Sequence, residues 1–556
     1  MSPLDLAKAN RSVAQALLDH ARRRAQQLDA TLAAKLATAI VMGQEEVVSA
    51  LRPAVAPVLG QEPWLRLLAF DADRIGDYVF ASSRPPIVLG GSRALEAINE
   101  EVDSSRITNA WPIYSAGGGG LLVQAESASA TDAAKALAGL FESRTHAGLS
   151  VTVVDLPVTV ADLLPAAKGP GLPATLRRMA EQLRVRKDME LPADDLLPAP
   201  DDPLCDSCQQ RAPAVQWEAA DRSLQLCLAC DARRKEGQSY ILGTDFQTIA
   251  NCGFGAARDG LCLLALDGNG MGELLEQLTT LAQVRAFSEA TATVMQQARD
   301  RAVASVEEQA CISLLSGGDE IVLVMPGGGA FEVADRILSD VAAGFAAMRQ
   351  DSVLVDVFRN NPAVLERLAA TTVGIGMVIA PPKLPVRQLH AYAMALQKSA
   401  KRSCYYGRSI AERRSGIDFA CLNDGSALPL GVRSIEQGVI RTGRSRLLRT
   451  SRPFDARSFG QVLAASQGLA RLAKSQVQAL RERCEDGAAV ATSHVCYQIA
   501  RDRRDRLGWV QWFEHCGVDS GKREAIAQWL FPQAGEHRSA LFLDLVEMNR
   551  WVGGMS

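Results

Sequence analysis

Residues 317–320 read Gly-Gly-Asp-Glu and place two adjacent carboxylates at the tip of a short hairpin. Apolar runs flank this tip, Ile312 to Leu315 before it and Ile321 to Met325 after it. Adjacent glycines allow a tight turn with close backbone approach. Carboxylates at the end of half-buried strands are costly unless a cation compensates them. Asp319 and Glu320 therefore indicate a metal site, and two magnesium ions beside a nucleoside triphosphate would satisfy it.

A third acid, Asp267, ends the apolar run 261–266. If this run pairs with the hairpin strands, Asp267 and Asp319 can share metal ions roughly 3.5 to 4 Å apart. One metal would lower the pKa of an attacking ribose hydroxyl, and the other would neutralise the triphosphate leaving group. The residues after the acid, Gly268, Asn269 and Gly270, form a turn whose backbone N–H groups can hold phosphate oxygens. The Gly268 carbonyl is a further candidate metal ligand.

Four of the twelve cysteines form two CxxC pairs separated by eighteen residues, namely Cys205, Cys208, Cys227 and Cys230. This spacing is typical of a zinc ribbon, in which two tight turns bring four thiolates into tetrahedral geometry. The alternative is a set of four reduced core cysteines, and a disulfide pairing is disfavoured in a cytoplasmic protein. Because no general base or open ligand position accompanies the motif, we expect a structural zinc ion.

The same order of elements occurs twice along the chain. In the first copy a strand over 65–70 ends at Asp71, and a hairpin over 113–123 carries four glycines at its tip. In the second copy a strand over 261–266 ends at Asp267, and the Gly-Gly-Asp-Glu hairpin follows. Each copy then continues with a helix and a strand, which predicts two βαββαβ units of roughly 150 residues with the ferredoxin-like palm fold.

Alignment of the two hairpins by sequence places Gly119 and Gly120 opposite Asp319 and Glu320. The first unit therefore lacks the acids of the second at its hairpin tip. We expect Asp71 to be structural or to orient a nucleotide, because it has no hairpin acids with which to share a metal.

At 556 residues and 47% hydrophobic, the chain can form several cores. We expect an α+β protein with two ferredoxin-like palms, an inserted zinc ribbon and helical terminal regions. Its net charge of −3 restricts any nucleic-acid contact to local patches. The expected parts are a helical segment (1–62), a degenerate first palm (63–198), a four-cysteine zinc domain (199–238), a second palm with the acidic hairpin (239–410) and a helical domain (411–556).

No uninterrupted apolar stretch reaches about 18 residues, and the first residues lack the apolar core of a signal peptide. We therefore expect a cytoplasmic protein without membrane contact. Proline, alanine and aspartate are frequent over 191–203, which predicts a linker ahead of the zinc domain. His390, near the start of a predicted helix, is expected to be a surface or capping residue.

Three segments resemble the catalytic palm of the type III CRISPR effector large subunit and, more distantly, diguanylate cyclases. They are LALDGNGMGELL, LLSGGDEIVLVMPGG and HAYAMALQKSAKR. The segment FDADRIGDYVFASSRPPIVLGGSRALEAI resembles the degenerate first palm of the same family. Two palms flanking a four-cysteine element, with a helical domain after them, match the architecture of that family over most of the chain.

The resemblance implies a nucleotidyltransferase that condenses ATP into cyclic oligoadenylates in antiviral defence, once its complex pairs guide RNA with target RNA. The implied partners are other type III effector subunits, guide RNA and target RNA. The implied cofactors are magnesium or manganese, held by Asp267, Asp319 and Glu320, with ATP as substrate. The implied nucleotide-contacting residues are Gly317 and Gly318, Lys401 with Lys398 as its competitor, and Ser115, Gly117 and Gly118 around a second ATP.

The sequence departs from the family in two places. Many members begin with an HD nuclease domain, but the first 145 residues here contain a single histidine, His20, so we expect no such nuclease. Glutamate stands at position 320 where many members have aspartate, and its longer side chain changes the metal geometry. Two alternatives remain open, a stand-alone cyclic-dinucleotide synthase of the diguanylate cyclase type and a catalytically silent scaffold subunit.

Overall fold

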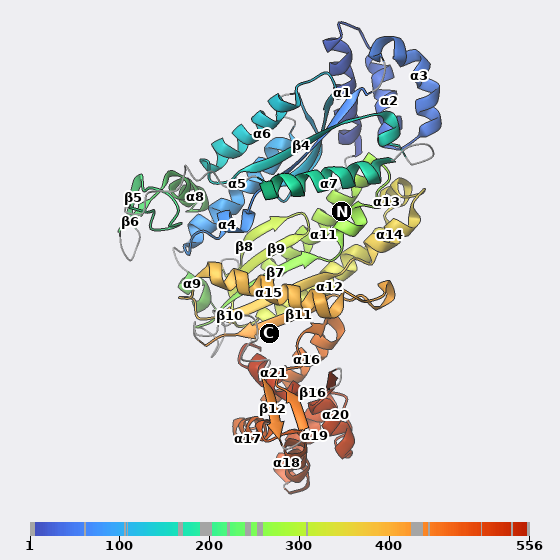
Figure 1. Ribbon diagram of the computed structural model, residues 1–556. Coiled ribbons are helices and arrows are strands. Elements are labelled where there is room, and N and C mark those ends of the chain that lie inside the picture. The colour runs from blue at the N-terminus through green and yellow to red at the C-terminus, as the bar shows by residue number, and fades with distance from the viewer. Residues whose placement is uncertain are drawn as a thin grey trace.

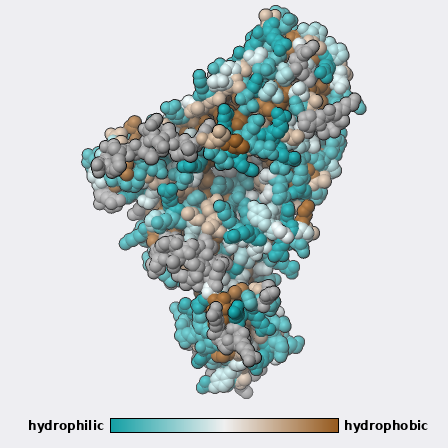
Figure 2. Space-filling model, viewed as in Figure 1, coloured by the Kyte–Doolittle hydropathy of each residue, from teal (hydrophilic) through white to brown (hydrophobic). Residues whose placement is uncertain are grey.

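The computed structural model describes most of the chain and arranges it as an elongated molecule, in which the second palm lies between the first palm and the C-terminal region (Figure 1). The predicted linker over 191–203 lies almost entirely outside the described residues. Among the described residues, no helix is both long and apolar enough to cross a membrane. The face seen in Figure 2 is hydrophilic over most of its area. The described residues are 6–60, 63–104, 107, 109–164, 171–189, 203–218, 223–238, 246–252, 259–306, 310–423, 438–442, 445–501, 503–534 and 537–552.

Three helices at the N-terminus pack as a unit, and α1 lies against strands β2 and β3 of the first palm. Their alanine-rich sequences bury one face each, which fits the helical period predicted for this region. The three helices are α1 (Leu6–Arg23), α2 (Ala30–Val41) and α3 (Glu45–Leu59).

The first palm is a four-stranded antiparallel sheet in the order β2-β3-β1-β4, with helices α5 and α6 packed together beside it. Helix α7, which the sequence did not predict, follows the last strand and packs on β4 and β1. The elements are β1 (Leu65–Ala72), α4 (Ile75–Val79), α5 (Pro85–Asp103), β2 (Trp111–Ala116), β3 (Gly119–Ala125), α6 (Ala130–Thr145), β4 (Val151–Val158) and α7 (Gly171–Met189).

The second palm repeats this strand order as β8-β9-β7-β10, which confirms the predicted pair of ferredoxin-like units. Strand β11 then adds in parallel to β10, and β14 extends the sheet to six strands. The elements are α9 (Phe246–Asn251), β7 (Leu261–Gly268), α10 (Met271–Leu275), α11 (Leu281–Ala304), β8 (Ile312–Gly317), β9 (Glu320–Pro326), α12 (Ala330–Ala347), α13 (Ser352–Val357), α14 (Pro362–Ala369), β10 (Val373–Ala380), α15 (Val386–Cys404), β11 (Gly416–Cys421) and β14 (Phe454–Asp455).

Strand register corrects the alignment of the two palms. Asp71 pairs with Gly119 across the first sheet, as Asp267 pairs with Glu320 across the second. Glu320 therefore corresponds to Gly119, so the sequence-based alignment is wrong by one residue. The reason is that Gly317 still pairs with Glu320 and is the last residue of β8. The turn of the second hairpin therefore begins at Gly318, one residue later than the Gly317-Gly318 pair suggests.

An irregularity in each hairpin supports the corrected alignment. The register of the first hairpin shifts between Pro112 and Tyr114, and that of the second shifts between Ser313 and Leu315. These positions coincide when Gly118 is placed opposite Asp319. The first palm therefore has glycine at both positions where the second palm has an acid, as expected, although at different residues.

The four-cysteine element and the C-terminal region complete the chain. The former consists of a small hairpin and helix α8, namely β5 (Val215–Glu218), β6 (Ser223–Leu226) and α8 (Leu228–Gln238). The latter is mainly helical, as predicted, but it also contains a four-stranded sheet in the order β12-β13-β16-β15. Its elements are β12 (Val439–Thr442), β13 (Ser445–Leu448), α16 (Ala456–Gly468), α17 (Lys474–Glu485), α18 (Ala488–Arg501), α19 (Arg503–His515), α20 (Arg523–Leu530), β15 (Gln533–Ala534), β16 (His537–Ser539) and α21 (Leu541–Asn549).

Candidate functional site

Two adjacent strands and one turn position the predicted acids. Asp267 lies near the end of β7 and pairs directly with Glu320, the first residue of β9. Asp319 lies in the preceding turn, where its carbonyl accepts a hydrogen bond of 3.1 Å from the Gly268 N–H group. A Cβ atom at Gly268 would lie only 2.9 Å from Asp319 Oδ2, so the absence of a side chain there makes room for this carboxylate.

Burial and the neighbouring charge of Asp267 raise the pKa of the two hairpin acids, Asp319 and Glu320. Burial, with the charge of Asp267 as a second cause, raises the pKa of Glu320 to about 7. Burial also raises the pKa of Asp319, and the neighbouring Asp267 adds to the rise, while Lys401 opposes it. Both effects disfavour the ionised carboxylates, which is the situation that a bound cation would relieve.

The carboxylates do not all converge in the structure. In the part of the chain that is described, the only residues with three or more potential ligand atoms within 4.8 Å of one another are the four cysteines. The charge of Asp267 acts on both Asp319 and Glu320, but the three carboxylates do not all lie within 4.8 Å of one another. The donors are all oxygen atoms, and this chemistry fits magnesium or manganese rather than a soft metal.

Lys401 of α15 is buried against the acids, with 7% of its surface exposed. Its ammonium group donates to a carboxylate oxygen of Asp267 and, at 2.9 Å, to the Gly268 carbonyl. A Cβ atom at Gly374, the partner of Asp267 on β10, would lie 2.6 Å from Lys401 Cγ, so this glycine makes room for the lysine. Lys398, its competitor for the triphosphate, is exposed.

A matching arrangement occurs in the first palm and was missed in the sequence. Lys187, near the end of α7, donates to Asp71 Oδ2 at 2.7 Å and to the Ala72 carbonyl at 2.9 Å. Each palm thus pairs the aspartate of its first strand with a lysine from the helix that follows its fourth strand. The signal that could have found Lys187 is its position late in a helix after the last palm strand, as for Lys401.

The turns of the two palms meet. A Cβ atom at Gly317 would lie 2.6 Å from the Gly117 Cα atom, so the backbones touch at a point where neither residue has a side chain. Behind this contact, Asn99 of α5 accepts hydrogen bonds from the Ser115 hydroxyl at 3.1 Å and the Gly118 N–H group at 3.3 Å. Asn99 carried no sequence signal, yet its side chain fixes the first-palm turn at this contact.

Two of the three backbone N–H groups expected to hold phosphate already have partners within the protein. The Gly268 N–H group donates to the Asp319 carbonyl, and the Asn269 N–H group donates to the Thr372 carbonyl at 2.8 Å. Both groups are already used within the protein because β7 continues to pair with its neighbours through Gly268. Gly270 follows with φ of 73°, in the left-handed region that favours glycine.

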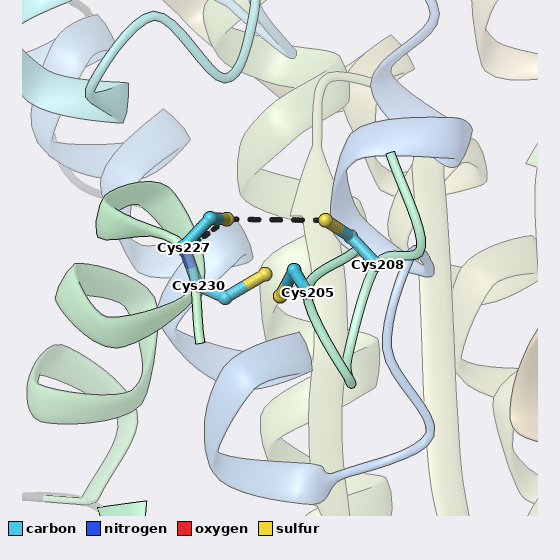
Figure 3. A group of neighbouring side chains, drawn as sticks. All are labelled: Cys205, Cys208, Cys227 and Cys230. Atoms are coloured by element: carbon cyan, nitrogen blue, oxygen red, sulfur yellow. Dashed lines mark hydrogen bonds between the residues drawn. The ribbon is translucent and has the colours of Figure 1, made fainter. Parts of the chain in front are cut away.

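The predicted zinc ligands lie together, as Figure 3 shows. All four sulfur atoms lie within 4.8 Å of one another and all four residues are buried, which fits a tetrahedral thiolate site. Arg233 links this site to the first palm, donating to Cys230 Sγ at 3.0 Å and to the Tyr78 carbonyl. Helix α8 also packs closely on α5, since a Cβ atom at Gly90 would lie 1.8 Å from the Arg233 carbonyl oxygen.

His390 is a contact between the palms and not the surface residue expected from the sequence. Its ring stacks on Phe80 of the first palm, with ring centroids 3.8 Å apart. Burial lowers its pKa to about 4, although the nearby Asp77 opposes this. Asp77 also pairs with Arg387 at 3.0 Å, so a second contact joins the same two elements. The position near a helix start misled the sequence analysis, because no local pattern indicates packing between domains.

Residues 260–408 match the family model for Cas10/Cmr2, second palm domain. This part of the chain is therefore similar to a Cas10/Cmr2 second palm. This segment contains Asp267, Asp319, Glu320 and Lys401. No curated protein sequence matches the chain.

Solved structures of the Csm1-Csm4 cassette share the fold. The cassette in complex with pppApA matches with a TM-score of 0.51 and 14% identity, covering 93% of this chain and 73% of that chain. The cassettes in complex with cA4 and with cA3 each give a TM-score of 0.50 at 14% identity, covering 91% of this chain and 72% and 73% of those chains. The resemblance to the type III CRISPR effector large subunit is thereby confirmed for the palm domain and the fold.

Proposed function

We propose that this chain is the large subunit of an RNA-guided type III effector complex and condenses ATP into cyclic oligoadenylates by two-metal nucleotidyl transfer. The observation that carries the proposal is the pair of Asp267 and Asp319, with Glu320 on the adjacent strand, at the edge of a Cas10/Cmr2 palm that faces a second palm. Magnesium or manganese bound there would activate a ribose hydroxyl and stabilise the triphosphate leaving group.

The residues of the chain have distinct roles in this proposal. Asp267, Asp319 and Glu320 would hold the metal ions, and the raised pKa values of Asp319 and Glu320 fit a site that is completed by cations. Lys401 would hold the Asp267 side chain in place until the metal and triphosphate arrive. Gly317 and Gly318 would line the nucleotide.

The first palm would hold the second ATP. Ser115, Gly117 and Gly118 form its turn, which abuts the second palm at Gly317. The two nucleotides would then lie between one palm with hairpin acids and one without them. A diguanylate-cyclase-type homodimer is the weaker alternative, because this chain already supplies both facing palms.

We also propose structural zinc at the four cysteines and the five-part division given above, with β11 and β14 assigned to the second palm because they pair in its sheet. The proposed protein partners are other effector subunits, since the matching structures are Csm1-Csm4 assemblies. Guide RNA and target RNA are the proposed nucleic-acid partners.

The test uses the assembled complex with labelled ATP or GTP, magnesium or manganese, and cognate target RNA, followed by chromatography of the products. Asp319→Ala with Glu320→Ala should abolish oligoadenylate formation while the complex still assembles. A matched control is Asp356→Ala with Glu366→Ala, which removes two exposed acids from α13 and α14 and should leave synthesis unchanged. Oligoadenylate from the Asp319/Glu320 variant would refute the assignment, GTP dimers would favour the cyclase alternative, and no turnover by the unaltered chain would favour a scaffold.

A further inference from the structure

Arg233 is a buried cation at the boundary between the four-cysteine element and the first palm. It belongs to α8 and is 4% exposed. Its guanidinium group donates to Cys230 Sγ at 3.0 Å, to the Tyr78 carbonyl and, at 3.4 Å, to the Ala229 carbonyl. The same group lies over the Tyr78 ring, 4.8 Å from its centroid. One side chain therefore contacts both a predicted metal ligand and a residue of the first palm.

No carboxylate neutralises Arg233 in the part of the chain that the structure describes. The buried acid of the same helix, Asp231, pairs instead with Arg234 and Lys235, each at 2.7 Å. A buried charge without an opposite charge is strongly disfavoured. The four sulfur atoms, which face one another (Figure 3), can supply that opposite charge, because four thiolates around one divalent cation keep two negative charges. The burial of Arg233 therefore fits a metal-loaded cluster better than four neutral thiols.

Backbone contacts fix the place of Arg233 on the first palm. A Cβ atom at Gly90 of α5 would lie 1.8 Å from the Arg233 carbonyl oxygen, and one at Gly237 of α8 would lie 1.8 Å from the Pro86 carbonyl oxygen. The two helices thus touch through their backbones at both positions, where neither glycine has a side chain. Helix α8 cannot slide along α5 without moving Arg233 and the contact to Tyr78.

Tyr78 belongs to the short helix α4, which contacts both palms. On the same helix, Ile75 meets the first-palm turn, since a Cβ atom at Gly118 would lie 2.8 Å from Ile75 Cδ1. The segment also contacts α15 of the second palm at two points. These contacts are the ion pair of Asp77 with Arg387 and the stacking of Phe80 on His390. Helix α4 therefore lies where the four-cysteine element, the first-palm turn and the second palm meet.

We infer that Arg233 couples metal binding at the four cysteines to the position of α4. Metal-bound thiolates neutralise the guanidinium group, which can then stay buried and hold the Tyr78 carbonyl. Loss of the metal removes this negative charge, so that Arg233 leaves its buried position and α4 loses the contact. Arg233 is thus a positioning residue at the junction of the palms. The inference rests on the structural zinc proposed above and does not depend on the nucleotidyl transfer.

The test compares zinc-loaded and chelator-treated full-length chain. Zinc affinity is measured by competition with a chromophoric chelator, and Arg233→Met should lower it about tenfold or more, as expected for the loss of a partner of a metal ligand. In the unaltered chain, zinc removal should speed hydrogen exchange of residues 75–80 about tenfold or more. In Arg233→Met this zinc dependence should disappear, because methionine needs no compensating charge.

Lys235→Met is the matched control. It removes one positive charge from the same helix, but the Lys235 side chain is 67% exposed and contacts Asp231 rather than a cysteine. Its zinc affinity, and the response of residues 75–80 to zinc removal, should match those of the unaltered chain.

Unchanged zinc affinity in Arg233→Met would overturn the inference. An equal response of residues 75–80 to zinc removal in the unaltered chain and in Arg233→Met would also overturn it, since packing alone would then support α4. If Arg233→Met fails to fold, Arg233→Lys keeps the test decisive. It retains the charge but lacks the planar fork that reaches both Cys230 and Tyr78, so residues 75–80 should exchange fast even with zinc bound, and slow exchange would contradict the inference.

Metal analysis of the unaltered chain separates the two proposals. If the chain contains no zinc, the zinc assignment fails and the coupling fails with it. If zinc is bound and its removal leaves the exchange of residues 75–80 unchanged, only the coupling fails.

Discussion

Substitution of Gly317 by alanine tests whether the two palms meet through their turns. The added Cβ atom would lie 2.6 Å from the Gly117 Cα atom, and contact distances below 3.4 Å are rare, so one turn must retreat by about 0.8 Å. Gly117 has no side chain to move aside, so the backbone itself must shift. Overpacking of this kind costs about 1 to 3 kcal/mol. A displacement near 1 Å between reacting groups reduces rates by roughly a hundredfold.

The assay combines thermal unfolding with oligoadenylate synthesis in the assembled complex. Gly317→Ala should lower the melting temperature and reduce synthesis by roughly a hundredfold. Gly139→Ala is the control, because a Cβ atom there, in the middle of α6, meets nothing within 4 Å and should slightly stabilise the helix. Gly317 has no positive φ, so backbone strain cannot explain a loss. If Gly317→Ala melts and reacts like the unaltered chain, the palms do not meet at this point.

Three further predictions follow from the contacts around the site. Burial lowers the pKa of His390 to about 4, so neutral His390 contributes to stability above pH 6.5. Up to about 3 kcal/mol of the free energy of unfolding is lost as pH falls toward 4. His390→Phe should therefore flatten the free energy of unfolding measured against pH in this range. Gly374→Ala should push Lys401 away from Asp267 and reduce oligoadenylate synthesis about tenfold or more. In a double-mutant cycle, the losses of synthesis from Gly374→Ala and Lys401→Ala should not add, and additive losses would contradict the contact. Cys205→Ser should abolish bound zinc by metal analysis and lower the melting temperature, whereas an unaltered chain without zinc would exclude the zinc site.

The sequence predicted helices and strands well where the spacing of apolar residues or a pair of glycines clearly marks the element. Strand β10 is buried along its whole length, and the hairpins are marked by glycines between apolar runs, so their positions were predictable. The four cysteines were predictable because their spacing itself describes the metal geometry. The additional strands β12 and β13 were not predictable from the sequence, because each has only four residues and is stabilised by its neighbours in the sheet.

Residues whose role depends on packing between distant segments carried no such signal. Lys187 meets Asp71 from a helix more than a hundred residues away, and Asn99 holds the first-palm turn from α5. His390 looked like a helix-start residue because Phe80 lies in the other palm. The shift of one residue in the hairpin alignment has the same origin, since hydrogen-bond register is a property of paired strands.

The balance of charge explains why the two palms would differ in their need for a metal. In the first palm, Lys187 contacts Asp71 and Asp73, and Asp73 also accepts hydrogen bonds from the Ser150 and Thr152 hydroxyls. The polar partners there come from the protein itself.

In the second palm, one lysine faces three carboxylates. Lys401 donates to Asp267, and the pKa of both Asp319 and Glu320 is raised because burial and the neighbouring charge disfavour their ionised forms. If all three acids ionise, the lysine leaves two negative charges uncompensated. The hairpin acids thus create a demand for divalent cations in one palm only, and the shared aspartate–lysine pair explains how the other palm keeps the same fold without it.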